Sequence, residues 1–220
     1  MHHELLRYEN VDELTTAAAN YVAEIASVAV ANGGAFNFAV SGGTTPWGMF
    51  EKLASLDLPW ENIVVYQVDE RVAPLDDPAR NLTNLRKSLA AVRLTIKAMP
   101  VNAKDLDIGA RAYGSELPDR FDLVHLGLGP DGHTASLLPD DSVLEVDDRP
   151  VALAGTYQGY RRMTLTYPAL SRADQILWLI AGSDKSSPLS LLLRSDPSIP
   201  AGRVVAAQSL VMADVAAAPK

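Results

Sequence analysis

Residues 35–46 have the sequence AFNFAVSGGTTP, which joins an apolar run, a glycine pair and a proline. The apolar run at residues 35–40 is typical of a buried strand. Ser41-Gly42-Gly43-Thr44-Thr45 follows as a turn, and Pro46 suits the first residue of a helix because the N–H it lacks would have no partner there. A strand that leads through a tight turn into a helix predicts an α/β fold.

The same alternation of strand-like and helix-like segments continues along the chain, as in α/β proteins with a mostly parallel sheet. Further strands are expected at residues 63–68, 121–128, 163–166 and 176–181, and helices at residues 12–31, 81–91, 133–137, 168–171, 184–193 and 214–218. These strands are nearly continuous apolar runs, which favours parallel strands covered on both faces. We expect a single domain over residues 1–220.

The composition narrows the class of protein. The 220 residues include 27 acidic and 19 Lys or Arg residues, no cysteine, and a formal net charge of −8. An acidic chain is a poor candidate for nucleic-acid binding, and a chain without cysteine has neither disulfides nor thiolate ligands, which fits a cytoplasmic protein. No signal peptide is expected, no apolar stretch reaches the roughly 18 residues of a membrane span, and His2 and His3 are assigned to a frayed terminus.

Polar residues follow three of the predicted strands. Residues 41–45 follow the first strand, Asp69-Glu70-Arg71 follows the strand at residues 63–68, and residues 129–133 follow the strand at residues 121–128. In an open parallel sheet, ligands bind beyond the carboxyl ends of the strands. We therefore expect these three clusters to meet in one crevice.

Two of the clusters have the composition of an anion site. Glycines let the backbone approach a phosphate, N–H groups at a helix start attract it, and the hydroxyls of Ser41, Thr44 and Thr45 could add hydrogen bonds. The alternative is an ordinary strand-to-helix turn with a threonine N-cap. Arg71 could hold a phosphate or carboxylate through its guanidinium group, or it could form an internal ion pair that stiffens the loop.

The third cluster has the composition of a catalytic turn. Two glycines and a proline precede His133, which we expect at the start of a helix, where the helix dipole favours the neutral imidazole that a general base needs. Asp131 could orient the ring. The alternative is a structural histidine, the role that we assign to His125 in the middle of its strand.

Other cations are candidates for phosphate binding. Arg161 and Arg162 precede the strand at residues 163–166, and Lys185 follows Gly182 after another strand. Each could bind a phosphate or be a solvated surface charge. No His-x-x-x-His or cysteine cluster predicts a catalytic metal, and no G-x-S-x-G motif predicts a serine nucleophile.

Taken in order, SGGTTP at 41–46, DER at 69–71 and GLGPDGHTASLLP at 127–139 resemble the 6-phosphogluconolactonase family, which shares a superfamily with the glucosamine-6-phosphate deaminases. The resemblance continues through Arg162, Lys185 and Asp214, so it covers nearly the whole chain. It implies a Rossmann-like three-layer α/β/α sandwich. It also implies hydrolysis of 6-phospho-D-glucono-1,5-lactone, without metal or cofactor, by a monomer or homodimer.

The resemblance also implies roles for individual residues. The phosphate would lie among Gly42, Gly43, Thr44, Arg71 and Lys185. His133 would lie near the lactone carbonyl and take a proton from water, Asp131 would orient it, and Asp69 would order water or sugar hydroxyls. Asn81 and Arg162 would be further substrate contacts.

The chain departs from the family pattern at a few positions, and these bear on the alternatives. Arg80 replaces the usual serine, and Leu138 replaces the usual phenylalanine of lactonases. Deaminases carry a glutamate at the position of Leu138, five residues after the histidine, so its absence favours the lactonase. A non-catalytic sugar-phosphate sensor is a second alternative, and the presence of both His133 and Arg71 argues against it.

Overall fold

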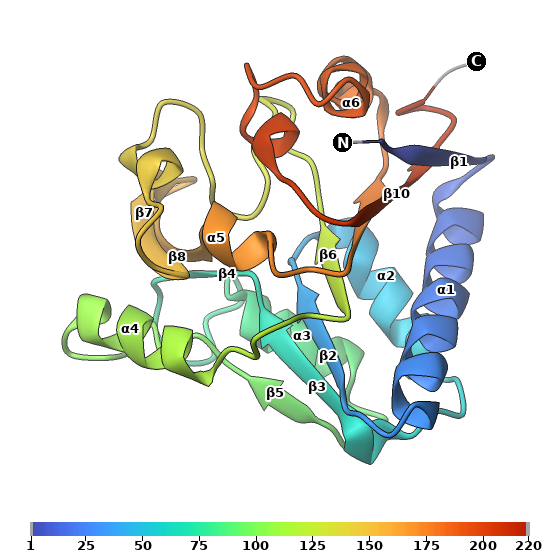
Figure 1. Cartoon of the computed structure of the whole chain (residues 1–220), viewed down its shortest axis with the longest axis horizontal. Helices are drawn as coiled ribbons and strands as arrows, with labels where there is room; N and C mark the ends of the chain where they lie inside the picture. Colours follow the sequence, from blue (N-terminus) through green and yellow to red (C-terminus); the bar gives the residue numbers. More distant parts are fainter. Residues whose placement is uncertain (1, 219–220) are drawn as a thin grey trace.

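The computed structural model describes residues 2–218, which form two sheets with helices around them (Figure 1). The larger sheet is parallel throughout, with the strand order β1-β10-β9-β6-β2-β3-β5. Its strands are β1 (Glu4–Tyr8), β2 (Phe36–Val40), β3 (Ile63–Gln67), β5 (Thr95–Lys97), β6 (Leu123–Leu126), β9 (Gln175–Ile180) and β10 (Gln208–Asp214). The predicted mostly parallel sheet is confirmed.

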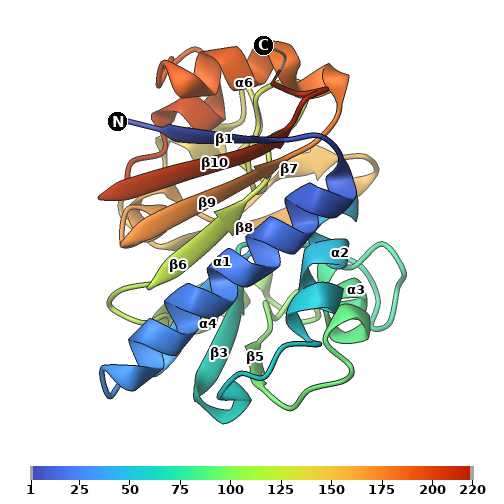
Figure 2. The same ribbon diagram turned by 90° about the vertical axis from the view of Figure 1, so that its right-hand side faces the viewer.

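Helices cover both faces of this sheet, which gives the predicted three layers. They are α1 (Val11–Ala31), α2 (Thr44–Leu53), α3 (Asn81–Ser88), α4 (Leu106–Glu116), α5 (Tyr167–Leu170) and α6 (Ser186–Leu193), with 3-10 turns η1 (Trp60–Asn62), η2 (Ser142–Glu145), η3 (Ser183–Lys185) and η4 (Pro200–Arg203). Figure 2 shows α1 lying across one face of the sheet with α2 and α3 beside it. In Figure 1, α4 and α5 lie on the opposite side of the sheet from α1.

Each face of the parallel sheet has its own apolar core because side chains alternate along a strand. Phe36 and Phe38 of β2 pack with α1 and α2, whereas Ala39, the next residue along the strand, joins the other cluster. On β9, Leu177 belongs to the first cluster and Trp178 to the second. Trp178 is completely buried in this core.

Helix α1 begins and ends with the expected caps. Asn10 Oδ1 accepts the backbone N–H of Glu13 at 2.9 Å, and Gly33, with a φ of 85°, follows the end of the helix. By length and composition alone α1 is apolar enough to cross a membrane, so the expectation that no stretch reaches that length is wrong. In the structure, Leu14 and Val22 are among the α1 side chains buried against the sheet.

The two ends of the chain form neighbouring strands that the sequence analysis missed. β1 pairs in parallel with β10. His3 is not frayed but buried, with its Nδ1 2.7 Å from Ser209 Oγ, and burial lowers its pKa to about 4. The helix expected at residues 214–218 is also wrong, because Asp214 ends β10 and its carboxylate accepts the N–H of Ala217 in a turn.

A second sheet is antiparallel, with the order β4 (Asp69–Arg71), β8 (Tyr160–Leu165) and β7 (Val151–Tyr157). The strand expected at residues 163–166 therefore exists, but its assignment to a parallel strand is wrong. β7 and β8 form a hairpin whose turn residues, Gln158 and Gly159, both have positive φ (50° and 82°), as a two-residue hairpin turn requires.

The order of strands fixes where a ligand can bind. β2 and β6 are neighbours in the sheet. The next strand of the sheet after β2 is β3, which lies on one side of this pair, and the next after β6 is β9, which lies on the other side. Such a reversal between neighbouring strands opens a crevice at their carboxyl ends. Ser41 leaves β2 at this point and donates its N–H to the carbonyl of His125 in β6 at 3.2 Å.

Candidate active site

A cleft of about 520 Å³ lies at this reversal and brings the three predicted clusters together. The predicted residues that line it are Ser41, Gly42, Gly43, Thr44, Thr45, Asp69, Arg71, Asn81, His133, Arg162 and Lys185. Asp131 lies behind His133 and is hydrogen-bonded to it. The expectation that polar residues after separate strands would converge is therefore confirmed.

The glycine turn presents the start of α2 to the cleft. The helix begins at Thr44, two residues before the expected Pro46, and its N-cap is Gly43, with a φ of 142° and no side-chain cap bond. Thus neither threonine is the N-cap. The N–H groups of the first helical residues, Thr44 and Thr45, have no acceptor within the helix and are suited to an anion. Ser41 Oγ is buried without a hydrogen-bond partner among the described residues.

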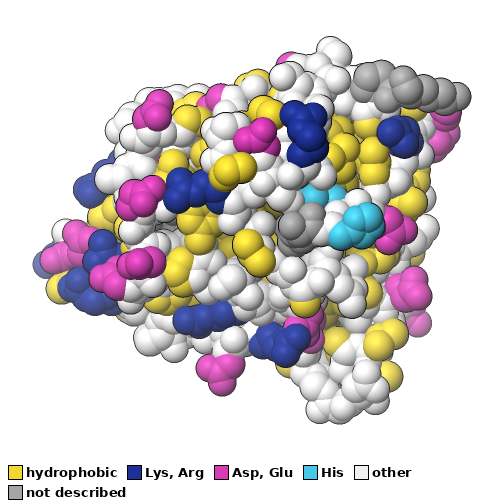
Figure 3. Space-filling view, turned by 45° about the horizontal axis from the view of Figure 1, so that its top comes forward, with side chains coloured by type: hydrophobic (Ala, Val, Ile, Leu, Met, Phe, Trp, Pro, Cys, Tyr) yellow, Lys and Arg dark blue, Asp and Glu magenta, His cyan; other side chains and the backbone are white. Residues whose placement is uncertain are grey.

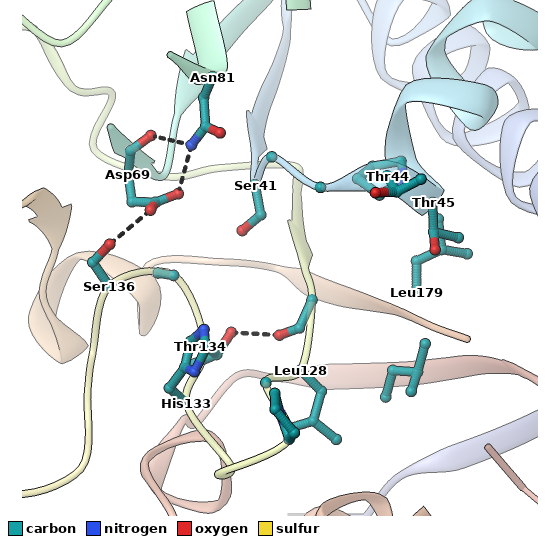
Figure 4. Close-up of a pocket in the computed structure, with 18 of the residues that line it drawn as sticks. Ser41, Thr44, Thr45, Asp69, Asn81, Leu128, His133, Thr134, Ser136 and Leu179 are labelled. Carbon is teal, nitrogen blue, oxygen red and sulfur yellow. Dashed lines mark hydrogen bonds between the residues drawn. The ribbon is translucent and has the colours of Figure 1, made fainter. Parts of the chain in front are cut away.

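Asp69 lies opposite this turn, and its carboxylate is already hydrogen-bonded. Figure 4 shows Asp69, Asn81 and Ser136 on one side of the cleft and Thr44 and Thr45 on the other. Ser136 donates its hydroxyl to Asp69 Oδ2 at 2.7 Å, and Asn81 Nδ2 donates to Asp69 Oδ1 at 3.1 Å. Asp69 is thereby held as an acceptor that orients its neighbours.

Glu70 is a buried residue that the sequence analysis quoted without assigning it a role. Its Oε1 accepts the backbone N–H groups of Arg71 (2.7 Å) and Asn81 (2.8 Å), so a single oxygen joins two residues that line the cleft. Its Oε2 accepts the N–H of Leu82 at 2.8 Å and lies 3.5 Å from Arg80 Nε. The Arg80 side chain, left in doubt from the sequence, is thus buried beside Glu70 and does not line the cleft.

Two arginines approach the cleft from the antiparallel sheet, where Arg71 pairs with Arg162 across β4 and β8. Arg71 Nη1 donates to Asn81 Oδ1. Arg162 is almost completely buried and donates to the carbonyls of Tyr157 (2.9 Å) and Tyr160 (3.3 Å). Burial, together with the neighbouring Arg71, lowers the pKa of Arg162.

These contacts distinguish the two consecutive arginines of β8. Arg162 Nη1 lies 3.9 Å from Asp69 Oδ2, and its guanidinium lines the cleft. Arg161 is exposed and is not among the lining residues in the described part of the chain. Of the two, Arg162 is therefore placed to meet a ligand.

The third cation of the cleft comes from the turn after β9. Lys185 ends η3, and its Nζ lies 2.8 Å from Asp184 Oδ2. Because the Lys185 side chain is mostly covered and the Asp184 side chain is mostly exposed, the ammonium lies at the wall of the cleft with one carboxylate partner.

His133 forms a close pair with Asp131. The distance from His133 Nδ1 to Asp131 Oδ1 is 2.5 Å, and the same oxygen accepts the His133 backbone N–H at 3.1 Å. Burial alone would raise the pKa of Asp131, but these hydrogen bonds outweigh it and hold the pKa below its ordinary value. Asp131 is therefore an ionised acceptor at neutral pH, so Nδ1 carries the proton and Nε2 has the free lone pair.

The expected helix at residues 133–137 is wrong. Thr134 and Leu137 form an isolated bridge, and Ala135 between them has a φ of 52°, which is outside the helical range. Thr134 Oγ1 donates to the carbonyl of Gly127 at 2.8 Å, which closes the turn around His133. The ring is thus oriented by a carboxylate and a tight turn, and a helix dipole has no part in it.

Ser136 and Tyr157 also line the cleft, and neither was predicted. The ring of Tyr157 lies 5.0 Å from that of His133 (centroid to centroid, at 64°), and Arg162 Cζ lies 5.6 Å from the Tyr157 centroid. Ser136 lies within the motif at residues 127–139, so the sequence could have indicated it. To place Tyr157 at the cleft from the sequence, Gln158-Gly159 would have had to be recognised as a hairpin turn.

On the face that Figure 3 shows, basic and acidic side chains are interspersed. Among the described residues that Figure 3 shows, Lys and Arg side chains lie apart, with acidic and apolar side chains between them. Within residues 2–218, no group of three or more His, Asp or Glu side chains is arranged to hold a metal ion. The described residues that line the cleft include hydrogen-bonding and positively charged side chains suited to a small anionic ligand.

Comparisons with known proteins show the family to which the chain belongs. The family model for glucosamine-6-phosphate isomerases and 6-phosphogluconolactonases matches residues 9–212. A 6-phosphogluconolactonase from Synechocystis is 38% identical over 175 residues (73% of this chain and 72% of the relative), and one from Caulobacter vibrioides is 31% identical over 207 residues (88% of each).

A solved structure shows the same arrangement of the chain. The crystal structure of 6-phosphogluconolactonase from Thermotoga maritima superimposes with a TM-score of 0.88 at 25% identity, covering 96% of this chain and 99% of the other. The fold, the residues that meet at the cleft and the match to the family model lead to the same conclusion. The chain belongs to the glucosamine-6-phosphate isomerase/6-phosphogluconolactonase family.

Proposed function

We propose that the chain hydrolyses 6-phospho-D-glucono-1,5-lactone to 6-phospho-D-gluconate in the pentose phosphate pathway. The observation that carries this proposal is the Asp131–His133 pair in the same cleft as the start of α2 and the cations Arg71 and Lys185. The pair supplies a base, and the rest of the cleft supplies positive charge and N–H donors for a phosphate. The relatives named above are lactonases by name.

The proton path follows from the hydrogen bonds. His133 Nε2 takes a proton from water as the water oxygen adds to the lactone carbonyl carbon, and the ionised Asp131 stabilises the imidazolium that forms. The ring C–O bond then breaks, and the imidazolium returns its proton to the leaving oxygen. The product is the open-chain acid, which loses a proton to the solvent.

The oxyanion formed during the addition needs a donor. The Gly129 N–H is already donated to the carbonyl of His133 at 2.7 Å, so we assign no role to it. Arg162, predicted as a substrate contact, is a candidate donor, because its guanidinium lines the cleft and its Nη1 lies 3.9 Å from Asp69 Oδ2. A buried guanidinium at that position would stabilise the negative charge strongly because little water screens it.

Phosphate binding would fix the geometry of the reaction. Thr44 and Thr45 N–H groups, Arg71 and Lys185 would hold the phosphate, which lies outside the bond that breaks, and so set the carbonyl beside His133. Asp69, with Ser136 and Asn81 on its oxygens, would support this arrangement and order the sugar hydroxyls.

The test is to generate the lactone in situ and to measure acid release by the wild type and by His133→Ala, with spontaneous hydrolysis subtracted. The wild type should accelerate hydrolysis, and His133→Ala should lose about 10²- to 10⁴-fold while still binding 6-phosphogluconate. No acceleration by the wild type would contradict the proposal, and so would ammonia release from glucosamine 6-phosphate. Equal activity of both proteins would remove His133 from the mechanism.

Three expectations from the sequence stay predictions. These are a single domain over residues 1–220, a cytoplasmic location, and a monomeric or homodimeric state.

A further inference from the structure

We propose that Tyr157 is a positioning residue, whose aromatic ring holds the imidazole of His133 in its reactive orientation. The inference rests on the proposed role of His133 as the general base. It assigns a function to the β7–β8 hairpin, which no motif of the sequence had suggested.

Asp131 alone does not fix the His133 ring. A single hydrogen bond at Nδ1 leaves the ring free to swing about that contact, and the Asp131 side chain is itself 38% exposed. His133 nevertheless has only 17% of its side chain exposed, so other groups must cover the ring. On one side the ring is covered by the backbone of Gly129, which lies so close that a Cβ atom added to this glycine would overlap the imidazole.

Tyr157 is a second group that covers the imidazole. The two ring centroids lie 5.0 Å apart at an angle of 64°, which is within the range of an edge-to-face aromatic contact. Together with Asp131 and Gly129, this contact limits rotation of the imidazole and keeps Nε2 in place.

Tyr157 is itself held firmly, although it lies at the tip of a hairpin. Arg162 donates one N–H to the Tyr157 carbonyl at 2.9 Å and another to the Tyr160 carbonyl at 3.3 Å, so it spans the turn. Its guanidinium also lies 5.6 Å from the centroid of the Tyr157 ring, within the range of a cation–π contact. The Tyr157 ring therefore contacts both His133 and a buried, hydrogen-bonded arginine.

The test compares four proteins: wild type, Tyr157→Leu, Tyr157→Phe and Tyr160→Leu. Tyr160 is the matched control because it pairs with Tyr157 across the same turn and is not among the described residues that line the cleft. The assay follows acid release from lactone generated in situ and gives kcat and KM. Calorimetry measures the affinity for 6-phosphogluconate.

We expect Tyr157→Leu to lower kcat by at least about 10-fold, because a base displaced by a fraction of an ångström loses its alignment with the attacking water. KM and the affinity for 6-phosphogluconate should change by less than about 3-fold, because the phosphate contacts remain. Tyr157→Phe, which keeps the ring, should retain at least about a third of kcat, and Tyr160→Leu should stay within about 2-fold of the wild type.

Three results would overturn the inference. The first is an unchanged kcat in Tyr157→Leu. The second is a rise in KM alone in Tyr157→Leu, which would indicate a substrate contact. The third is a loss of kcat in Tyr157→Phe equal to that in Tyr157→Leu, which would assign the effect to the hydroxyl. If Tyr157→Leu fails to fold, Tyr157→Met replaces it with the same expectations. A wild type without activity would refute the proposed function, and an active wild type with an equally active Tyr157→Leu would refute this inference alone.

Discussion

Gly129→Ala is a small change that should disable the site without unfolding the protein. Gly129 is not among the described glycines with positive φ, so alanine is compatible with its backbone. An added Cβ, however, would lie 2.7 Å from Asp131 Oδ1 and closer still to the ring of His133. Both obstacles are side chains, so the dyad can move aside while the turn stays folded.

The size of the effect follows from the required displacement. Non-bonded heavy atoms prefer separations of about 3.5–4.0 Å, so the carboxylate and the imidazole must shift by about 1 Å. A misplacement of that size costs about 10²-fold in rate, which corresponds to roughly 2.7 kcal/mol of transition-state stabilisation. We expect kcat/KM to fall by about that factor.

The assay is acid release from lactone generated in situ, with thermal unfolding as a check on the fold. Gly34→Ala is the control, because a Cβ there would meet only an ordinary contact at 3.6 Å from the Ala29 carbonyl and Gly34 is not among the described residues that line the cleft, and its activity should stay within about 3-fold of the wild type. If Gly129→Ala keeps wild-type activity, then either His133 is not the base or its orientation does not limit the reaction.

Three further predictions use other parts of the structure. Gly42→Ala should raise KM more than it lowers kcat, in steady-state kinetics, because the added methyl would overlap the side chain of Asn81. Burial lowers the pKa of His125 from 6.5 to about 3. As the pH falls, this histidine is therefore protonated in the unfolded chain before it is protonated in the folded one, and the free energy of unfolding drops by about 2 kcal/mol between pH 7 and 5. His125→Leu should show a smaller drop when urea titrations at these two pH values are compared. Glu70→Gln should lower the free energy of unfolding by about 3–5 kcal/mol, because it breaks a buried ion pair, whereas Glu116→Gln, which breaks an exposed pair with Lys97, should cost less than about 1 kcal/mol in the same urea titrations.

The sequence predicted the site well where function depends on neighbouring residues in the chain. Ser41, Asp69 and Gly129 each come directly after a predicted apolar strand, and parallel strands place their carboxyl ends at one edge. Convergence of the three clusters could therefore be inferred without knowing the strand order. The pairing of His133 with Asp131 could also be inferred locally, because Asp131 lies two residues before His133 in the sequence.

The prediction failed where distant contacts decide the conformation. Residues 133–137 have a composition compatible with a helix, but the bond from Thr134 to Gly127 and the positive φ of Ala135 hold a turn there. His3 is buried only because β1 finds β10 at the far end of the chain. No local sequence pattern predicts this pairing, because a short strand with exposed residues is stabilised by its partner strand.

The β7–β8 hairpin was missed for a different reason, and its signal was present. Gln158-Gly159 between two strand-like segments is compatible with a two-residue turn, in which both residues need positive φ. Without this hairpin, Tyr157 could not be placed near His133.

The antiparallel sheet gives this enzyme a modular construction. His133 and the start of α2 follow strands of the parallel sheet, whereas Tyr157 and Arg162 are carried by a strand pair joined to it through β4. Exchange of residues 158–160 between relatives would therefore vary the wall of the cleft at Gln158, while Tyr157 keeps its place beside His133 and the fully buried Met163 and Leu165 keep the strand anchored. Diversification of substrate range, in nature or in a directed library, has a starting point in these turn residues.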